Sequence, residues 1–214
     1  MSKSVAVLGM GQFGRYITEE LCESGAEVVI ADNNEEIINQ YADMVSIAIV
    51  AELSDPDAIS NIGLSNMDVV VVSMGDNLES SIMCVMVAKE EGVKRVLAKA
   101  SSERMANILK KVGADEIIFA EKESAKSNAR KIMSSNFLEF FEISKNVCVV
   151  SLRPKKEWIG KSLKELRLRE KHKINVITMK KNNRIMSYLS PEEIIYEDTE
   201  LYILADVNRL KKLK

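Results

Sequence analysis

The strongest constraint on the fold is a glycine-rich loop that lies between a strand-like run and a helical pattern. The apolar run Val5–Leu8 leads directly into the spacing Gly-x-Gly-x-x-Gly, formed by Gly9, Gly11 and Gly14. In such a unit the first glycine allows a tight turn, the second lets the backbone approach phosphate, and the third lets the helix pack closely on the strand. The sequence therefore predicts a βαβ unit whose loop can bind the pyrophosphate of a nucleotide.

Further strand-like runs recur at intervals that leave room for helices. The runs are continuously apolar, which is typical of strands that are buried on both faces of a parallel sheet. They are Val5–Leu8, Val28–Ala31, Ile47–Val50, Val69–Val72, Val96–Ala98 and Ile117–Phe119. This alternation predicts an α/β fold with a Rossmann-like, doubly wound parallel sheet that ends near residue 120.

The spacing of the apolar residues changes near residue 140. We therefore expect two domains, a nucleotide-binding domain at residues 1–140 and a small α+β domain at residues 141–214. The elements expected in the second domain are strands at Val147–Leu152, Ile174–Met179 and Leu201–Leu204, a helix from Ser162 to about Lys171, and a C-terminal helix.

The segment before this boundary allows two interpretations. A helix is expected from Glu121 to about Ser135, and the following run Asn136–Ile143 contains three of the five phenylalanines in the chain. This apolar run either forms an interface between domains or subunits, or is a helix that packs on its own sheet.

Composition narrows the class of protein. Apolar residues make up 46% of the 214 residues and charged residues 29%, which is ordinary for a folded domain. The three cysteines, Cys22, Cys84 and Cys148, are too far apart to form a metal knuckle, so we interpret them as buried apolar side chains.

No apolar run approaches the roughly 18–20 residues that span a bilayer. We therefore expect a cytoplasmic protein whose membrane role, if it has one, requires a partner.

The positive charge of the chain is concentrated in one stretch. Residues 153–184 contain 12 basic and 3 acidic residues. Apart from Trp158 the stretch lacks aromatic residues for base stacking, and it contains no motif that reads DNA, so we expect no nucleic acid partner. A solvated basic face and a site for a small anionic ligand both remain open.

Polar residues follow the predicted strands at their carboxyl ends, where doubly wound sheets bind ligands. Asp32 lies 21 residues after Gly11, the spacing of a carboxylate that accepts hydrogen bonds from both ribose hydroxyls and disfavours the 2′-phosphate of NADP. For the candidates after the later strands, an ordinary turn or a solvated lysine is the alternative. The candidate nucleotide-binding residues are Gly9, Gly11, Gln12, Phe13, Gly14, Asp32, Asn33, Glu52, Ser73, Gly75, Asn77 and Lys99.

The sequence offers little for catalysis. Its one histidine, His172, lies beyond the predicted domain boundary, and its serines, cysteines and carboxylates match no nucleophile motif. The length also leaves no room for a substrate domain of normal size. We therefore expect a protein that is not an enzyme, with a small NAD-dependent oxidoreductase as the alternative.

Several runs resemble the regulatory subunits of bacterial Trk/Ktr potassium uptake systems. The N-terminal part is similar to their nucleotide-binding RCK domain in GMGQFGRYITEEL, VVIADNNEE, VVVVSMGDN, LAKASS and KKVGADEIIFAEKES. The later run GKSLKELRLREKHKINVITMKKNNRIMSYLSPEEIIYEDTELYILAD is similar to the smaller C-terminal domain of the same family. Together these runs cover nearly the entire chain.

The resemblance implies a regulatory subunit that gates ion flow without catalytic turnover. In this family, nucleotide domains pair into dimers, four dimers form a ring beneath a membrane potassium channel or transporter, and exchange of ATP, ADP or NAD(H) changes the ring. A chain of this kind is cytoplasmic and peripheral to the inner face of the membrane through its partner.

The resemblance also implies roles for individual residues. The three glycines would hold phosphates and Asp32 the ribose. Glu52 and the Ser73–Asn77 turn would lie at the nucleoside and Lys99 at a phosphate. Glu121 matches a carboxylate that can hold a divalent cation near the nucleotides at the dimer interface, and an acidic residue that only stabilises its helix N-terminus is the alternative.

Two positions depart from the family pattern. Gln12 stands where ATP-responsive relatives often carry arginine. Because an amide brings no charge, we do not expect strong discrimination of ATP from ADP, and NAD(H) or AMP-type ligands gain weight among the candidates NAD(H), ATP, ADP and AMP. Some relatives bind cyclic di-AMP through a stretch similar to LRLREKHKINVI, in which Arg169 and Asn175 match and His172 and Ile174 lie nearby. Lys173 stands where a glycine often lies, and a surface role for His172 is the alternative.

Overall fold

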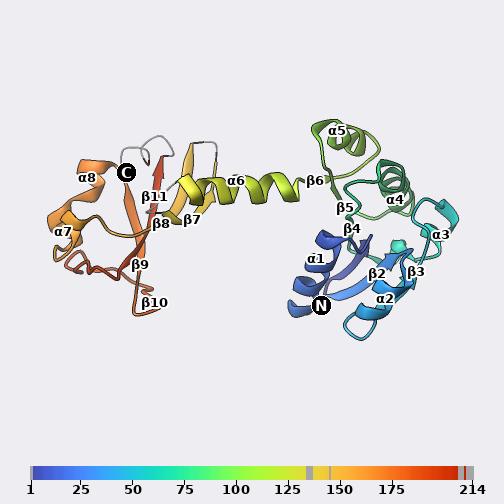
Figure 1. Cartoon of the computed structure of the whole chain (residues 1–214), viewed down its shortest axis with the longest axis horizontal. Helices are drawn as coiled ribbons and strands as arrows, with labels where there is room; N and C mark the ends of the chain where they lie inside the picture. The colour runs from blue at the N-terminus through green and yellow to red at the C-terminus, as the bar shows by residue number, and fades with distance from the viewer. Residues whose placement is uncertain (1, 134–136, 145, 207–209, 211–214) are drawn as a thin grey trace. The chain divides into compact units, whose positions relative to one another are not determined.

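The structure is a computed structural model that describes residues 2–133, 137–144, 146–206 and 210. The chain divides into two compact units, Met1–Glu123 and Ser124–Lys214 (Figure 1). Each unit has its own sheet and its own hydrophobic core. Within the described residues, no helix combines the length and the apolar character needed to cross a bilayer.

The first unit contains a parallel six-stranded sheet in the order β3-β2-β1-β4-β5-β6. This is the strand order of dinucleotide-binding folds, so the predicted Rossmann-like fold is confirmed. Because Leu8 pairs with both Ala31 and Val72, the carboxyl ends of the central strands meet at one edge of the sheet. The strands are β1 (Ser4–Leu8), β2 (Glu27–Asp32), β3 (Ile47–Val50), β4 (Val69–Val72), β5 (Arg95–Lys99) and β6 (Glu116–Ile118).

Both faces of the central strands β1, β2 and β4 are covered, which explains why these strands are continuously apolar. Along β1, Ala6 and Leu8 belong to one core cluster and Val5 and Val7 to another, and all four are buried. The first cluster includes residues of α3, α4 and α5, and residues of α1 and α2 complete the second. The helices are α1 (Gln12–Glu23), α2 (Glu35–Tyr41), α3 (Pro56–Ser60), α4 (Leu78–Glu90) and α5 (Glu103–Lys111), and α6 (Ala120–Met133) follows β6.

Four of these helices begin with a side chain that caps them. The oxygens of Asn34, Asp55, Asn77 and Ser102 accept hydrogen bonds from first-turn amides of α2, α3, α4 and α5, as short polar side chains commonly do. Helix α1 begins at Gln12, inside the glycine loop, directly after the extended backbone of Gly11.

The second unit contains an antiparallel sheet in the order β10-β9-β11-β8-β7, and the predicted α+β class is confirmed. Short helices accompany the sheet, and Trp158, Leu168 and Ile174 are among the residues of their shared core. The elements are β7 (Phe137–Glu142), β8 (Val147–Leu152), η2 (Lys156–Trp158), α7 (Leu163–Leu166), α8 (Leu168–His172), β9 (Asn175–Lys181), β10 (Arg184–Ile185) and β11 (Glu200–Asp206).

The structure corrects two expectations in this unit. Residues 137–142 form β7 and pair with β8, so the helix considered for this run is wrong there. An interface role for the run stays a prediction. The domain boundary expected at 140/141 stays a prediction, and in the structure these two residues belong to β7. The single helix expected from Ser162 is two helices, because Arg167 has a left-handed backbone with φ of 49°. The predicted C-terminal helix falls on residues 207–214, of which only Leu210 is described.

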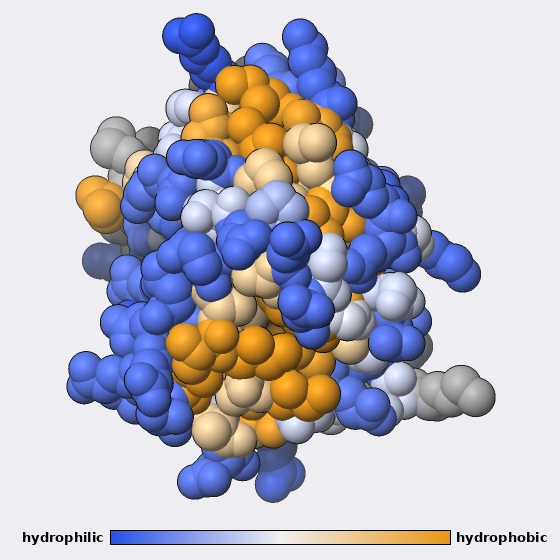
Figure 2. All heavy atoms as spheres, turned by 90° about the vertical axis from the view of Figure 1, so that its right-hand side faces the viewer, coloured by the Kyte–Doolittle hydropathy of each residue, from blue (hydrophilic) through white to orange (hydrophobic). Residues whose placement is uncertain are grey.

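Hydrophobic side chains gather in two areas on one face of the molecule, with hydrophilic side chains between them (Figure 2). Exposed large hydrophobic side chains of the first unit include Met44, Ile47 and Val50, at the edge strand β3, and Met86 on α4. Met86 and Val112 line a pocket of about 340 Å³ together with Lys89 and Glu90. These apolar areas are candidates for contacts with another protein chain.

The glycine loop is packed against its own neighbours at two of its three glycines. A Cβ atom on Gly14 would lie 2.1 Å from the carbonyl oxygen of Gly9 and 2.7 Å from Oγ of Ser73. Gly9 has φ of 94°, and a Cβ atom there would lie 2.5 Å from Cγ of Met74. Gly11 differs, because a Cβ atom on it would meet no atom within 4 Å.

This difference predicts the effect of alanine on stability. Gly14→Ala forces α1 away from the loop, so we expect the free energy of unfolding of the first unit to fall by about 1–3 kcal/mol. Gly11→Ala is the matched control and should change it by no more than about 0.5 kcal/mol. Urea unfolding followed by circular dichroism measures both free energies of unfolding. Circular dichroism is used in place of tryptophan fluorescence because the single tryptophan, Trp158, belongs to the second unit. Equal midpoints for Gly14→Ala and the wild type would contradict the packing described.

Candidate functional site

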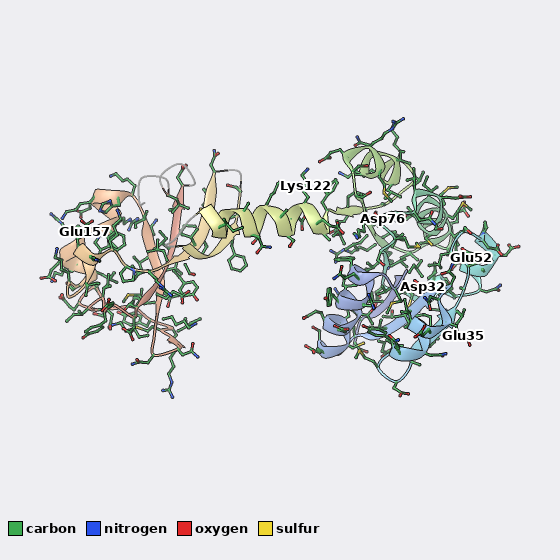
Figure 3. All side chains as sticks on the ribbon, in the orientation of Figure 1. Asp32, Glu35, Glu52, Asp76, Lys122 and Glu157 are labelled. Carbon is green, nitrogen blue, oxygen red and sulfur yellow. The ribbon has the colours of Figure 1, made fainter. Side chains whose placement is uncertain are left out.

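The predicted nucleotide-binding residues lie at the carboxyl edge of the parallel sheet. The amide of Gly9 donates to the carbonyl of Ala31 (2.8 Å), and the amide of Ser73 donates to the carbonyl of Leu8 (2.9 Å). The glycine loop therefore lies between the ends of β2 and β4. Asp32, Glu52 and Asp76, which follow three of the strands, are labelled in Figure 3.

The start of α1 is the most open helix N-terminus among α1–α5. Gly11 is its N-cap residue and makes no side-chain hydrogen bond, and the first turn contains no acidic residue. The other four helices each have a side-chain cap and at least one carboxylate in the first turn. Because first-turn amides and the helix dipole attract anions, this end of α1 is suited to a phosphate. Gln12 is exposed beside it and Phe13 is half-buried.

Asp32 is held at the rim of the glycine loop. One carboxylate oxygen accepts a hydrogen bond from the amide of Met10 (2.5 Å), and the other accepts one from the amide of Asn34 (2.9 Å). Each carboxylate oxygen has a second lone pair, so the group can still accept hydrogen bonds from ribose hydroxyls. The geometry thus fixes a half-buried acceptor beside the loop, as the sequence spacing predicts.

Asn33 and Glu52 are brought together from the ends of β2 and β3. The amide nitrogen of Asn33 donates to Oε2 of Glu52 (3.2 Å), and the hydroxyl of Ser54 donates to Oε1 (2.9 Å). These donors, the Ser54 hydroxyl foremost, hold the pKa of Glu52 below its usual value. Glu52 is therefore a fixed, ionised acceptor beyond Asp32 along the sheet edge.

The polar residues after β4 hold the turn in place. The buried Ser73 donates its hydroxyl hydrogen to the carbonyl of Gly9, and Oδ1 of Asn77 caps α4 by accepting from the amide of Ser80 (3.1 Å). Both side chains thus have structural partners within the first unit. Their contact with a nucleotide stays a prediction.

Lys99 and Glu121 were predicted from the sequence for two different roles. In the structure they form an ion pair with 2.6 Å between Nζ and Oε1. The Lys99 side chain is 12% exposed and that of Glu121 is 69% exposed. The hydrogen bond from Lys99 lowers the pKa of Glu121 below its usual range. This pair was not predicted from the sequence, although Glu121 lies only three residues after β6, the strand that pairs with β5.

No cluster suited to a metal ion is found in the part of the chain that the structure describes. A cluster here means three or more histidine, cysteine, aspartate or glutamate side chains that could surround an ion. A divalent cation at Glu121 would need further ligands, so this role stays a prediction.

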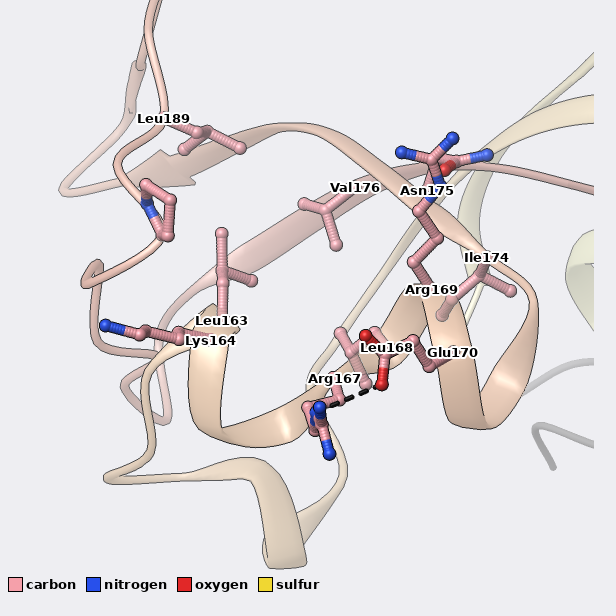
Figure 4. Close-up of a pocket in the computed structure, with 11 residues that line it drawn as sticks. Leu163, Lys164, Arg167, Leu168, Arg169, Glu170, Ile174, Asn175, Val176 and Leu189 are labelled. Atoms are coloured by element: carbon pink, nitrogen blue, oxygen red, sulfur yellow. Dashed lines mark ion pairs between the residues drawn. The ribbon is translucent and has the colours of Figure 1, made fainter.

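A pocket of about 660 Å³ lies in the second unit, beside α7, α8 and β9 (Figure 4). Arg169, Ile174 and Asn175, three of the four residues predicted for a second ligand, line it. The fourth, His172, packs its ring against Trp158 with 5.9 Å between the ring centroids. The pocket is lined by Leu163, Lys164, Arg167, Leu168, Arg169, Glu170, Ile174, Asn175, Val176, Leu189 and Pro191.

The sequence analysis missed Arg167 as a pocket residue. Its guanidinium pairs with Glu170 at 3.0 Å, so it brings a partly compensated positive charge to the pocket. The spacing Arg-x-Arg in LRLRE was the available signal. However, only the left-handed backbone at Arg167 decides where the two arginines point.

Two family models match the chain. The TrkA-N domain matches residues 5–120, and the TrkA-C domain matches residues 149–214. The Ktr system potassium uptake protein C of Bacillus subtilis (strain 168) is 32% identical over 214 residues, which cover 100% of this chain and 97% of that protein. The Ktr system potassium uptake protein A of Vibrio alginolyticus is 33% identical over 184 residues, 86% of this chain and 84% of that protein.

Solved structures show the same fold at low sequence identity. The GsuK RCK domain has a TM-score of 0.66 and 12% identity over 100% of this chain, which spans 47% of that chain. The GsuK channel bound to NAD has a TM-score of 0.67 and 11% identity, and the match covers 98% of this chain and 38% of that one. The fold, the two family models and the Ktr relatives agree, and this chain belongs to the family of TrkA-type potassium uptake proteins that join a TrkA-N domain to a TrkA-C domain.

Proposed function

We propose that this chain is a nucleotide-binding regulatory subunit of a potassium uptake system, in which a separate membrane protein carries the ion. The observation that supports this most is the open N-terminus of α1 at Gly11 beside the fixed carboxylate of Asp32. The first suits the phosphates and the second suits the ribose of one nucleotide. The Ktr relatives are named as potassium uptake proteins, and they match this chain over most of their length.

The ligand we propose is an adenine nucleotide, and NAD(H), ADP or AMP fits better than ATP. Gln12, which follows Gly11 at the start of α1, is exposed and uncharged. It can donate a hydrogen bond to a phosphate but adds no charge for a terminal one. A structural neighbour, the GsuK channel, has been solved with NAD bound.

The alternative, a small NAD-dependent oxidoreductase, finds less support. The only histidine of the chain is in the second unit, where its ring packs on Trp158. An oxidoreductase also needs a group that exchanges protons with its substrate near neutral pH. Incubation with NADH and a panel of carbonyl compounds separates the two functions, because only the enzyme would lose absorbance at the nicotinamide band.

Regulation requires that a ligand binds one arrangement of the assembled subunits more tightly than another. We propose a cytoplasmic homo-oligomer, built from dimers as an octameric ring, that contacts the membrane through its partner. The exposed apolar side chains at β3 and on α4 support contacts between chains. No step of this mechanism needs chemical turnover.

A second ligand of the same general kind, cyclic di-AMP, is proposed for the pocket of the second unit. Arg169 and Asn175 line the pocket and supply a charge and an amide, while Leu163, Val176 and Leu189 supply apolar surface. Cationic and apolar groups in one pocket suit a ligand that combines phosphates with bases.

Nucleotide binding is tested by thermal unfolding with NAD, NADH, ATP, ADP and AMP. A ligand at 100 times its Kd should stabilise the wild type by about 2.7 kcal/mol. In Gly11→Val the branched side chain fills the space at the start of α1, so this stabilisation should disappear. Asp43→Asn is the control, because Asp43 precedes β3 at the opposite edge of the sheet and should bind as the wild type does. Equal stabilisation of Gly11→Val and the wild type would show that the nucleotide binds elsewhere.

Cyclic di-AMP binding is tested by calorimetry on the full chain. We expect Arg169→Ala to weaken binding at least about tenfold, because a charge-assisted hydrogen bond to phosphate is lost. Arg184→Ala is the control, since Arg184 is an exposed arginine outside the residues that line the pocket. Equal losses in the two variants would indicate a general effect of charge and not a specific site.

Assembly is tested by light scattering at micromolar concentration, with and without nucleotide. The proposed function predicts a dimer or a larger closed assembly, because the ligand is proposed to favour one arrangement of the ring over another. A mass that stays at that of one chain, 24.0 kDa, under all conditions would exclude the ring.

A further inference from the structure

The ion pair between Lys99 and Glu121 lies beside the proposed phosphate site. Lys99 ends β5, and its Nζ atom lies 6.0 Å from the centroid of the Phe13 ring. Phe13 is in the first turn of α1, two residues after Gly11. The ammonium group that Glu121 holds is therefore close to the helix end at which phosphates are expected to bind.

The course of the Lys99 side chain is fixed by its surroundings. It runs across Gly75, where a Cβ atom would lie 2.9 Å from Cε, 3.1 Å from Cδ and 3.1 Å from Nζ of Lys99. Gly75 itself is buried. Because the aliphatic part of Lys99 is enclosed and only its end meets a partner, the ammonium group has little freedom to move away from this corner.

We propose that Glu121 and the phosphates of a bound nucleotide compete for Lys99, so that Glu121 lowers the affinity of the site for phosphate-bearing ligands. This inference rests on the proposed function. One half-enclosed ammonium group cannot give its full attraction to two anions at once, and water screens each contact less there than at an open surface. A phosphate that binds at Lys99 therefore weakens the hold on Glu121, and by linkage Glu121 weakens the phosphate equally.

The competition acts on the start of α6, the helix that runs from the first unit into the second. Two ion pairs hold its first turn to the first unit, Lys99 with Glu121 and Lys122 with Glu103 on α5. Lys122 also lies 4.9 Å from the ring centroid of Phe119, just before the helix. A phosphate at Lys99 replaces only the first of these pairs, so a bound nucleotide changes one defined contact of α6 and leaves the other in place.

The inference separates ligands by their phosphates. Adenosine does not compete for Lys99, whereas AMP, ADP and NAD do. Removal of the Glu121 charge should therefore tighten the binding of AMP, ADP and NAD and leave adenosine unchanged. A residue with a merely structural role would affect all four ligands in the same direction.

The test is calorimetric titration of the full chain with these four ligands, in a chelating buffer so that no divalent cation acts through Glu121. We expect Glu121→Gln to lower the Kd of ADP roughly three- to tenfold, the size of a partly exposed ion pair. Lys99→Met should raise it. In the double variant Lys99→Met/Glu121→Gln, the change at Glu121 should have no further effect, because its partner is absent.

The matched control is Glu123→Gln. It removes the same charge from the same helix turn, but Glu123 lies two residues on and points about 200° around the helix from Glu121. Its Kd for ADP should equal that of the wild type. Thermal unfolding of each free variant checks that the fold is retained.

Each result decides between the two proposals. If the wild type binds none of the four ligands, the proposed function is wrong and this inference falls with it. If the wild type binds ADP but Glu121→Gln binds it equally or more weakly, only the inference is wrong. A gain that persists in the Lys99→Met background, or appears equally in Glu123→Gln, would also overturn it, because the effect would then not pass through Lys99.

Discussion

Three elements of the first unit meet at the carbonyl group of Gly9, which follows β1. Gly14 lies against it with no room for a side chain, and the buried hydroxyl of Ser73 donates to it. The end of β1, the start of α1 and the end of β4 therefore contact one another at this carbonyl oxygen. With these elements fixed, the amide of Met10 faces Asp32, and the first-turn amides of α1 are left open at Gly11. The candidate nucleotide site is a consequence of this packing.

The features that were predictable from sequence are those with a local signal. The central strands β1, β2 and β4 are continuously apolar because both of their faces are covered, and β1 shows this in Ala6 and Val7, which belong to different core clusters. The glycine spacing and Asp32 are equally local, because a tight turn needs glycine and the carboxylate follows one βαβ unit later. The helix caps at Asn34 and Asn77 follow from short polar side chains before helices.

The features that were missed depend on contacts between distant segments. Lys99 ends β5 and Glu121 lies three residues after β6, but only the pairing of β5 with β6 makes them neighbours. The phenylalanine-rich run before residue 143 fits either a helix or a strand by its apolar spacing, and pairing with β8 decides for the strand. Arg167 divides the predicted helix in two because its backbone is left-handed, a conformation that an arginine does not predict.

The two units have separate cores and are continuous in the chain. Helix α6 supplies the continuity, since it begins in the first unit and ends in the second. The first turn of this helix is held by two ion pairs that differ in exposure. Lys99 is enclosed and lies next to the proposed phosphate site, whereas Lys122 is about half exposed. Water screens the Lys122 contact more strongly than the contact of the enclosed Lys99, so the proposed effect of a ligand's charge falls on the pair of Lys99 with Glu121.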